Sequence, residues 1–148
     1  MIKYKEAINI IKRVSLKLGG EKVSILNSAN RICDSNIHSP SEMPLHNNTA
    51  FDGFAVIAKE TKGTSPKNKK KFKIIKTIAA GDVPKINNYK KNSVIEIMTG
   101  GLVPEPFDSV LAVEKAKYFP RKENATHILI DKEIKKFSFI RFAGEDYK

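Results

Sequence analysis

The chain has 148 residues, a formal net charge of +11, 41% hydrophobic residues and 29% charged residues. This composition excludes a disordered chain, and the length suits one domain or two small lobes. No apolar run approaches the roughly 18 residues of a membrane helix, and residues 1–6 lack the apolar core of a signal peptide. We therefore expect a soluble, cytoplasmic protein with no membrane partner.

The cysteine and histidine content excludes several kinds of site. Cys33 is the single cysteine, so neither an internal disulfide nor a cysteine-based zinc cluster can form. We expect it to be a small buried hydrophobe. His38, His46 and His127 lack the spacing of a helical metal site, and we interpret them as structural or surface residues.

The positive charge is concentrated in one segment. Residues 59–76 contain eight lysines and a single acid, Glu60. The centre of this segment, residues 65–73, predicts a solvated hinge or hairpin tip. A nucleic-acid partner is disfavoured, because the chain has 23 lysines against 4 arginines and no ladder of aromatic residues interleaves with the lysines. The alternative role is to steer an anionic ligand toward a nearby site.

The N-terminal third predicts one helix and little else. Residues 3–18 carry apolar side chains at helical spacing, and two glycines at 19–20 would end the helix. Residues 23–26 predict a short strand. Residues 28–33 predict one helical turn capped by Asn27 or Ser28. The loop at 39–44 is a candidate lobe boundary.

After Pro44 the pattern becomes that of short strands separated by turns. We expect strands at residues 54–58, 72–78, 94–98, 110–114, 127–130 and 137–142. Strands of this length and spacing suggest a small barrel or sandwich. The expected fold class is therefore mixed α+β and β-rich, with an N-terminal amphipathic helix and a small β-barrel-like lobe of about six strands.

A first cluster of polar residues occupies the loop 43–56, directly before an expected strand. Asn48 and Thr49 offer neutral hydrogen bonds, and Asp52 offers a carboxylate for a metal or a proton. The plainer alternative is that Asp52-Gly53 is an ordinary turn dipeptide.

A second cluster, at residues 97–104, brings Thr99 to the end of an expected strand just before Gly100 and Gly101. Glycines let the backbone approach a ligand and can direct N–H groups at an anion. The alternative is a glycine turn between strands.

A third cluster, residues 140–146, places Glu145 and Asp146 directly after Gly144. Adjacent carboxylates of this kind could serve Mg²⁺. The alternative is a charged, frayed end of the chain.

In this order and spacing the clusters resemble one family, the molybdopterin molybdenumtransferases, which include bacterial MoeA and the E domain of gephyrin. Residues 44–56 resemble the family signature P-x-x-D-N-S-A-M-D-G-Y-A-V. Residues 80–81 with 97–100 resemble its AG…I-x-TGAPLP segment, residues 108–114 its D-A-V-V-x-x-E, and residues 141–146 its R-x-x-G-x-D. Residues 29–32 and the N-terminal helix fit its opening, so the resemblance spans nearly the whole chain.

The sequence departs from the family pattern at a few positions. Asn47 stands where the family has Asp, Thr49 where it has Ser, and Phe51 where it has Met. Glu96 occupies a position that is Arg in many relatives, and residues 101–104 replace its APLP. Asp52, Thr99 and Asp146 match the family.

The resemblance implies two lobes of a larger architecture. Residues 1–45 and 136–148 would form a linker and dimerisation lobe, and residues 46–135 an inserted β-rich lobe. The family's molybdopterin-binding α/β domain has no counterpart among these 148 residues. The chain alone is therefore expected to be incomplete and inactive.

The resemblance also implies a function, the Mg²⁺-dependent insertion of molybdate into adenylylated molybdopterin. Asp52, Thr99 and Asp146 would be catalytic, and Asp52 and Asp146 would bind the metal. The residues that would contact substrate or orient the loop are Asn48, Thr49, Gly53 and Gly100, with Thr99 and the backbone of Gly100 binding an oxyanion. The implied partners are a second copy of the chain and, upstream, a molybdopterin adenylyltransferase. The alternatives are a non-catalytic dimerisation or scaffolding module and, least favoured, a lysine-rich polyanion binder.

Overall fold

A computed structural model describes residues 1–14, 18–86 and 89–148. The chain divides into two compact units, Met1–His38 and Ser39–Lys148. None of the helices in the described parts of the chain has the length and apolar character of a membrane-spanning segment.

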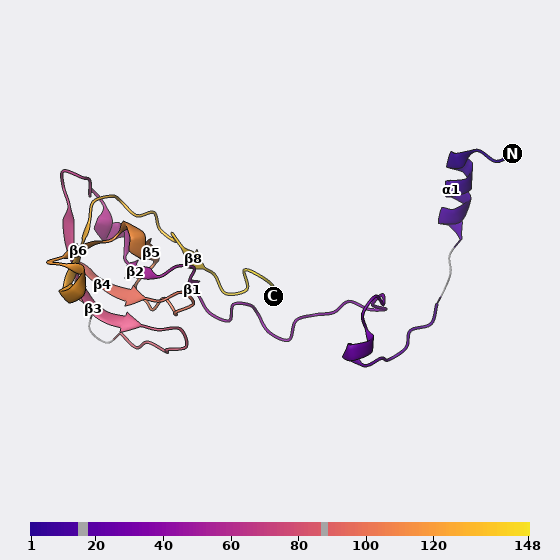
Figure 1. The fold of residues 1–148 in the computed structure, drawn as a ribbon, viewed down its shortest axis with the longest axis horizontal. Coiled ribbons are helices and arrows are strands. Elements are labelled where there is room, and N and C mark those ends of the chain that lie inside the picture. The colour runs from indigo at the N-terminus through magenta and orange to yellow at the C-terminus, as the bar shows by residue number, and fades with distance from the viewer. Residues whose placement is uncertain (15–17, 87–88) are drawn as a thin grey trace. The chain divides into compact units, whose positions relative to one another are not determined.

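The first unit contains one α-helix, α1, at Tyr4–Arg13 (Figure 1). The backbone of Val14 is extended, so this helix ends before the glycines that were expected to cap it. Residues 15–17 of the expected helix 3–18 lie outside the described residues. Helical spacing of apolar residues therefore located the helix but overestimated its length.

The predicted strand at 23–26 and the predicted helical turn at 28–33 are both wrong. A 3₁₀ turn occupies Ile25–Asn27 instead, and the Ser24 hydroxyl accepts the N–H of Leu26 at 3.4 Å. A serine in the capping position favours a helical turn at this point. The described residues of this unit also provide no neighbouring strand with which 23–26 could pair.

The described residues of the first unit form no hydrophobic core of their own. None of its described residues is buried, and Cys33 is exposed, so the expected burial of this cysteine is wrong. Many of its large apolar side chains are exposed, among them Ile11, Leu18 and Ile32. Burial of these side chains needs a surface that the unit itself does not supply.

The second unit is built on a six-stranded sheet that curls into a half-barrel (Figure 1). Its strands, in spatial order, are β5 (Ser109–Ala112), β2 (Gly53–Val56), β4 (Ser93–Ile97), β3 (Lys70–Ile78), β7 (His127–Ile130) and β6 (Lys117–Phe119). Neighbours are antiparallel except β3 and β4, which are parallel. A second, two-stranded sheet pairs β1 (Asn48–Thr49) with β8 (Ile140–Arg141). The expected fold class is confirmed.

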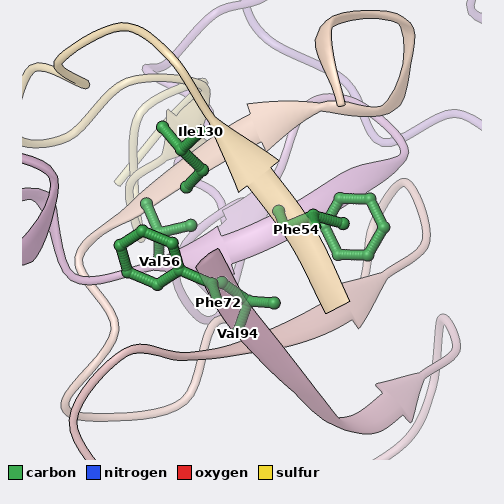
Figure 2. Packing of buried hydrophobic residues seen from close by; sticks show 6 residues of the cluster. Phe54, Val56, Phe72, Val94 and Ile130 are labelled. Atoms are coloured by element: carbon green, nitrogen blue, oxygen red, sulfur yellow. The ribbon is translucent and has the colours of Figure 1, made fainter. Parts of the chain in front are cut away.

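The core lies on both faces of the six-stranded sheet, because successive side chains of a strand point to opposite faces. One face carries the cluster around Phe54 and Phe72, and Figure 2 shows these two rings together with Val56, Val94 and Ile130. The other face carries the cluster around Ala55, Ile95 and Ile97, which packs against Phe107. Alternate residues of β2 and β4 thus contribute to both cores.

Five of the six expected strands are present, some with shifted ends. The expected strands at 54–58 and 110–114 end early, at Val56 and Ala112, because a 3₁₀ turn begins shortly after each. The segment 137–142 forms only the two-residue β8, since Phe137 and Phe139 adopt positive φ angles of 66° and 56°. The short strands β1 and β6 were not predicted.

The lysine-rich segment, residues 59–76, is a strand only in its last part, and its start lies in the 3₁₀ turn Ala58–Thr61. Only Ser65–Asn68 forms the expected tight turn, and β3 begins at Lys70. Glu60, the single acid of this segment, accepts hydrogen bonds from the Tyr89 hydroxyl and from the N–H of Asn92 at 2.9 Å. The acid is therefore a structural partner of the following loop.

Candidate functional site

The three loop motifs, far apart in the sequence, meet around the strand β1. The N–H of Thr49 donates to the carbonyl of Gly101 at 3.1 Å, and the N–H of Gly100 donates back to Thr49 at 3.0 Å. On its other side β1 pairs with β8, where Asn48 lies opposite Arg141. The first motif thus lies between the second and the third.

The closest side-chain contact between motifs joins Asp52 to Thr99. Asp52 Oδ1 accepts the backbone N–H of Thr99 at 2.6 Å and its hydroxyl at 2.7 Å. The register of the sheet explains the contact, because Gly53 of β2 pairs with Ile97 of β4. Residues that directly precede β2 and follow β4 must therefore meet at the same end of the sheet.

Asp52 is an exposed carboxylate that the fold keeps ionised. The N–H of Thr99 has the largest effect and its hydroxyl adds to it, and together they hold the pKa of Asp52 below its ordinary value. One carboxylate oxygen carries both hydrogen bonds. The result is an oriented negative charge at the surface.

Packing and backbone geometry explain why glycine occupies two positions of the motifs, Gly53 and Gly100. A Cβ built on Gly53 would lie 2.1 Å from the carbonyl oxygen of Leu111, on the neighbouring strand β5. Gly100 has a φ of +79°, in the left-handed region that favours glycine. Its N–H is already used by Thr49. A direct contact of either glycine with substrate stays a prediction.

Asn48 and Thr49 form β1, directly before the residues that lead to Asp52. Thr49 is 1% exposed, and its hydroxyl both donates to the carbonyl of Phe51 at 2.6 Å and accepts the N–H of Phe51 at 3.2 Å. This turn fixes the backbone leading to Asp52. Asn48 Oδ1 is buried and has no hydrogen-bond partner among the described residues.

Asn47 connects the motifs, although the sequence marked it only as a departure from the family. Its Oδ1 accepts the N–H of Ala143 at 3.0 Å, and its carbonyl accepts the N–H of Val103 at 3.2 Å. A single residue of the first motif thus holds both of the others. In the sequence, only its position next to Asn48 in the first motif pointed to this connecting role of Asn47.

Asp146 has a different partner from Asp52. Its carboxylate forms an ion pair with Arg141 within the third motif, and both side chains are about two-fifths exposed. Glu145 accepts the N–H of Phe142 at 2.8 Å and so closes the turn before Asp146. The third motif is therefore an ordered turn, and the alternative of a frayed end is not supported.

The described residues contain no group of three or more His, Cys, Asp or Glu side chains able to hold a metal ion. They do present Asp52 as an ionised, exposed carboxylate. Mg²⁺ is usually held by one or two carboxylates together with substrate phosphates. The residues present fit a Mg²⁺ of that kind and do not form a complete site.

The fold and the site define a half-barrel lobe in which three loop motifs converge beside the exposed carboxylate of Asp52. Residues 2–148 match the family model described as MoeA N-terminal region (domain I and II). The chain belongs to this family, and the expected family membership is confirmed. The family is one of molybdopterin and molybdenum cofactor biosynthesis.

Named relatives agree with the family assignment. The chain is 30% identical over 147 residues to a molybdopterin molybdenumtransferase of Staphylococcus epidermidis, covering 99% of this chain and 34% of the relative. It is 27% identical over 150 residues to the enzyme of the same name from Synechococcus elongatus, covering 36% of that protein. The chain therefore spans about a third of the length of these curated relatives.

Solved structures share the fold. A molybdopterin biosynthesis moeA protein from Pyrococcus horikoshii OT3 superimposes with a TM-score of 0.75 at 26% identity, covering 86% of this chain and 32% of that one. A second crystal structure of the Pyrococcus protein covers 99% of this chain with a TM-score of 0.70 at 27% identity.

Proposed function

We propose that the chain forms the N-terminal part of a molybdopterin molybdenumtransferase. The whole enzyme would insert molybdate into adenylylated molybdopterin in a Mg²⁺-dependent reaction, cleaving the adenylyl link and placing molybdenum on the dithiolene sulfurs. Family membership and the names of the relatives support this reaction class. The residues of this chain would supply one wall of the active site.

The observation that carries the proposal is the pair of hydrogen bonds from Thr99 to Asp52. When one carboxylate oxygen is held by hydrogen bonds, the other is left available to bind a ligand. Because the group is already oriented, it does not have to reorganise during the reaction. Asp52 would therefore be the residue of this chain that meets the metal or the substrate. Thr99 would act through Asp52, as a positioning residue.

Bound Mg²⁺ would offset the charge of the substrate phosphates and polarise the adenylyl link. Asp52 would hold it through one carboxylate oxygen, and further ligands would come from the substrate phosphates or from beyond these 148 residues. Asp146 is the second candidate, although its ion pair with Arg141 would have to rearrange for it to bind a metal.

The expected oxyanion-binding role of Thr99 and Gly100 stays a prediction. Both donors of Thr99 point at Asp52, and the N–H of Gly100 points at the carbonyl of Thr49. None of these donors is directed at an external anion in this arrangement. Arg141, which lies opposite Asn48 and pairs with Asp146, would be a cation near the converging motifs.

The proposal is tested by substitutions in the native polypeptide that carries these residues. Asp52→Asn keeps the shape of the side chain and removes its charge, and Thr99→Val removes only the hydroxyl hydrogen bond. Release of AMP and transfer of molybdenum are measured separately, with Glu123→Gln, an exposed carboxylate outside the motifs, as matched control.

We expect Asp52→Asn to abolish both steps. Thr99→Val should lower the rate and leave residual activity, because the backbone N–H of Thr99 still holds Asp52. Wild-type activity in Asp52→Asn would overturn the proposal. Molybdenum transfer by the 148 residues alone, above metal-free controls, would overturn the expectation that they are incomplete.

A second candidate function is a non-catalytic dimerisation or scaffolding module of the same family. The exposed apolar side chains of Met1–His38 favour it, because they need a covering surface. We propose that this surface is a second copy of the chain, in the cytoplasm. For the enzymatic function proposed above, a molybdopterin adenylyltransferase would provide the substrate. If scaffolding is the sole function, Asp52→Asn and Thr99→Val leave partner binding intact and no activity is detected in wild type.

A further inference from the structure

The outer strands of the large sheet leave one face uncovered. Cross-strand pairing places Lys71 of β3 opposite Leu129 of β7 and Leu129 opposite Lys117 of β6. The next row consists of Lys73, His127 and Phe119. Directly opposite residues share a face of the sheet. We call these six residues the basic face: Lys71, Lys73, Lys117, Phe119, His127 and Leu129.

The opposite face of the same strands is core. Phe72 and Ile128 are fully buried, and Tyr118 packs against them. On the basic face, by contrast, the three lysines and Phe119 are exposed, and His127 and Leu129 are half-buried. The alternation of β3, β6 and β7 thus leaves one side free for a ligand.

This openness is confined to the outer strands. On the neighbouring strand β4 the same side of the sheet holds Ile95 and Ile97, which are fully buried beneath Phe107. Lys73 marks the border, since it pairs with Ser93 at the start of β4. The fold therefore covers half of one sheet face and leaves the other half open.

The basic face has a concentrated positive field. The ion pairs of the described residues include one between Lys117 and Asp131, and none that involves Lys71 or Lys73. Partial burial of the ring, with a further contribution from the charges of Lys71 and Lys73, holds the pKa of His127 below its ordinary value. The absence of an ion-pair partner for Lys71 and Lys73 among the described residues leaves their positive charge on this face unneutralised.

Two flat rings lie among these cations. The Phe119 ring is 40% exposed and stands edge to face with the His127 ring at a centroid distance of 6.5 Å. The ammonium group of Lys71 lies 3.7 Å from the centre of the Phe119 ring. A base can stack on an exposed ring of this kind while the adjacent lysine moves to a phosphate.

We propose that the basic face binds single-stranded nucleic acid, with Phe119 stacking on a base and Lys71 and Lys73 contacting successive phosphates. Alternate residues of a strand lie about 6.6 Å apart, a separation comparable to that of neighbouring phosphates in an extended strand. A polar sheet face with exposed aromatic rings is a general platform for single strands. This inference is independent of the proposed enzymatic function. It departs from the expectation that nucleic acid is disfavoured, because strand pairing brings the Phe119 ring to Lys71, which is distant in the sequence.

The aromatic rings favour nucleic acid over other polyanions. Inorganic polyphosphate and acidic polypeptides would use the lysines but would gain nothing from stacking on Phe119. The test therefore separates stacking from charge, using the 148-residue chain and fluorescein-labelled oligothymidylate and oligouridylate. Inorganic polyphosphate and polyglutamate serve as competitors.

Phe119→Ala is the decisive variant, and Phe137→Ala is its matched control. Phe137 is also exposed and also has a lysine over its ring, Lys136 at 4.7 Å, but it lies outside the basic face. Lys71→Ala and Lys136→Ala form the matching charge pair. Phe119→Trp changes the same position but keeps a ring that can stack, so it separates the loss of stacking from a loss of folding.

We expect Phe119→Ala to weaken oligonucleotide binding about 5- to 150-fold, the range for loss of one stacked base. It should leave polyphosphate binding unchanged, and Phe119→Trp should retain affinity. Lys71→Ala should weaken binding and reduce the salt dependence of log K by about 0.7. Both control variants should match wild type.

Three results would overturn the inference. The first is no oligonucleotide binding at low salt. The second is an unchanged affinity of a folded Phe119→Ala protein for the oligonucleotide, which would mean that binding depends on charge and not on stacking. The third is equal competition by polyglutamate, which would indicate an acidic protein as the partner.

Discussion

Replacing Gly53 by alanine tests whether the sheet, rather than a ligand, requires glycine beside Asp52. Gly53 is buried at the start of β2, where it pairs with Ile97 on one side and Ala112 on the other. A methyl group at this position would lie 2.1 Å from the carbonyl oxygen of Leu111 and 3.0 Å from its carbonyl carbon. Both atoms are backbone atoms, so no side chain can rotate away.

The expected cost follows from that geometry. Carbon atoms in contact prefer separations of about 3.5–4.0 Å, so the strands would have to part by more than 1 Å. Overpacking of a core typically costs about 1–3 kcal/mol, and parting the strands would also weaken the ladder bonds, at about 1 kcal/mol each. We therefore expect Gly53→Ala to lower the free energy of unfolding by about 3 kcal/mol.

Urea unfolding followed by far-ultraviolet circular dichroism measures this change. Gly81→Ala is the matched control, because a Cβ there meets nothing within 4 Å and the backbone has a φ of +89°. That variant should lose only about 1 kcal/mol, the cost of a left-handed residue. A Gly53→Ala protein as stable as the Gly81→Ala control would refute the packing argument.

Three further changes have defined outcomes. Thr49→Val should lower the free energy of unfolding by about 1–3 kcal/mol, because it leaves buried backbone groups without their hydroxyl partner, whereas Thr49→Ser should restore most of it in the same urea titration. Thr99→Val should raise the pKa of Asp52 toward, but not to, its ordinary value, measured by carboxyl-carbon NMR; an unchanged pKa would show that the hydroxyl bond is absent in solution. Lys71→Ala should raise the pKa of His127 in an NMR titration, since it removes a nearby positive charge, and no rise would contradict the cationic field of the basic face. Because the folded-state pKa of His127 is lowered, its contribution to stability is present above its unfolded pKa and declines as pH falls below that value.

The sequence located most strands, because alternation and turn residues are local signals. The segments 127–130 and 72–78 were found nearly to the residue. The strand expected at 137–142 failed because positive φ angles at Phe137 and Phe139 break the extended backbone, and nothing in residue type announces them. The strands β1 and β6 are too short for a periodic signal.

The sequence by itself determined the residue types, the order of the motifs and thereby the family. Only the tertiary structure decided which residues act together. Asp52 and Thr99 meet because β2 and β4 pair in one register, and a shift of one residue would separate them. Likewise, Phe119 lies among the lysines of β3 because β7 stands between β6 and β3. Such contacts depend on long-range strand pairing, which no local pattern along the chain encodes.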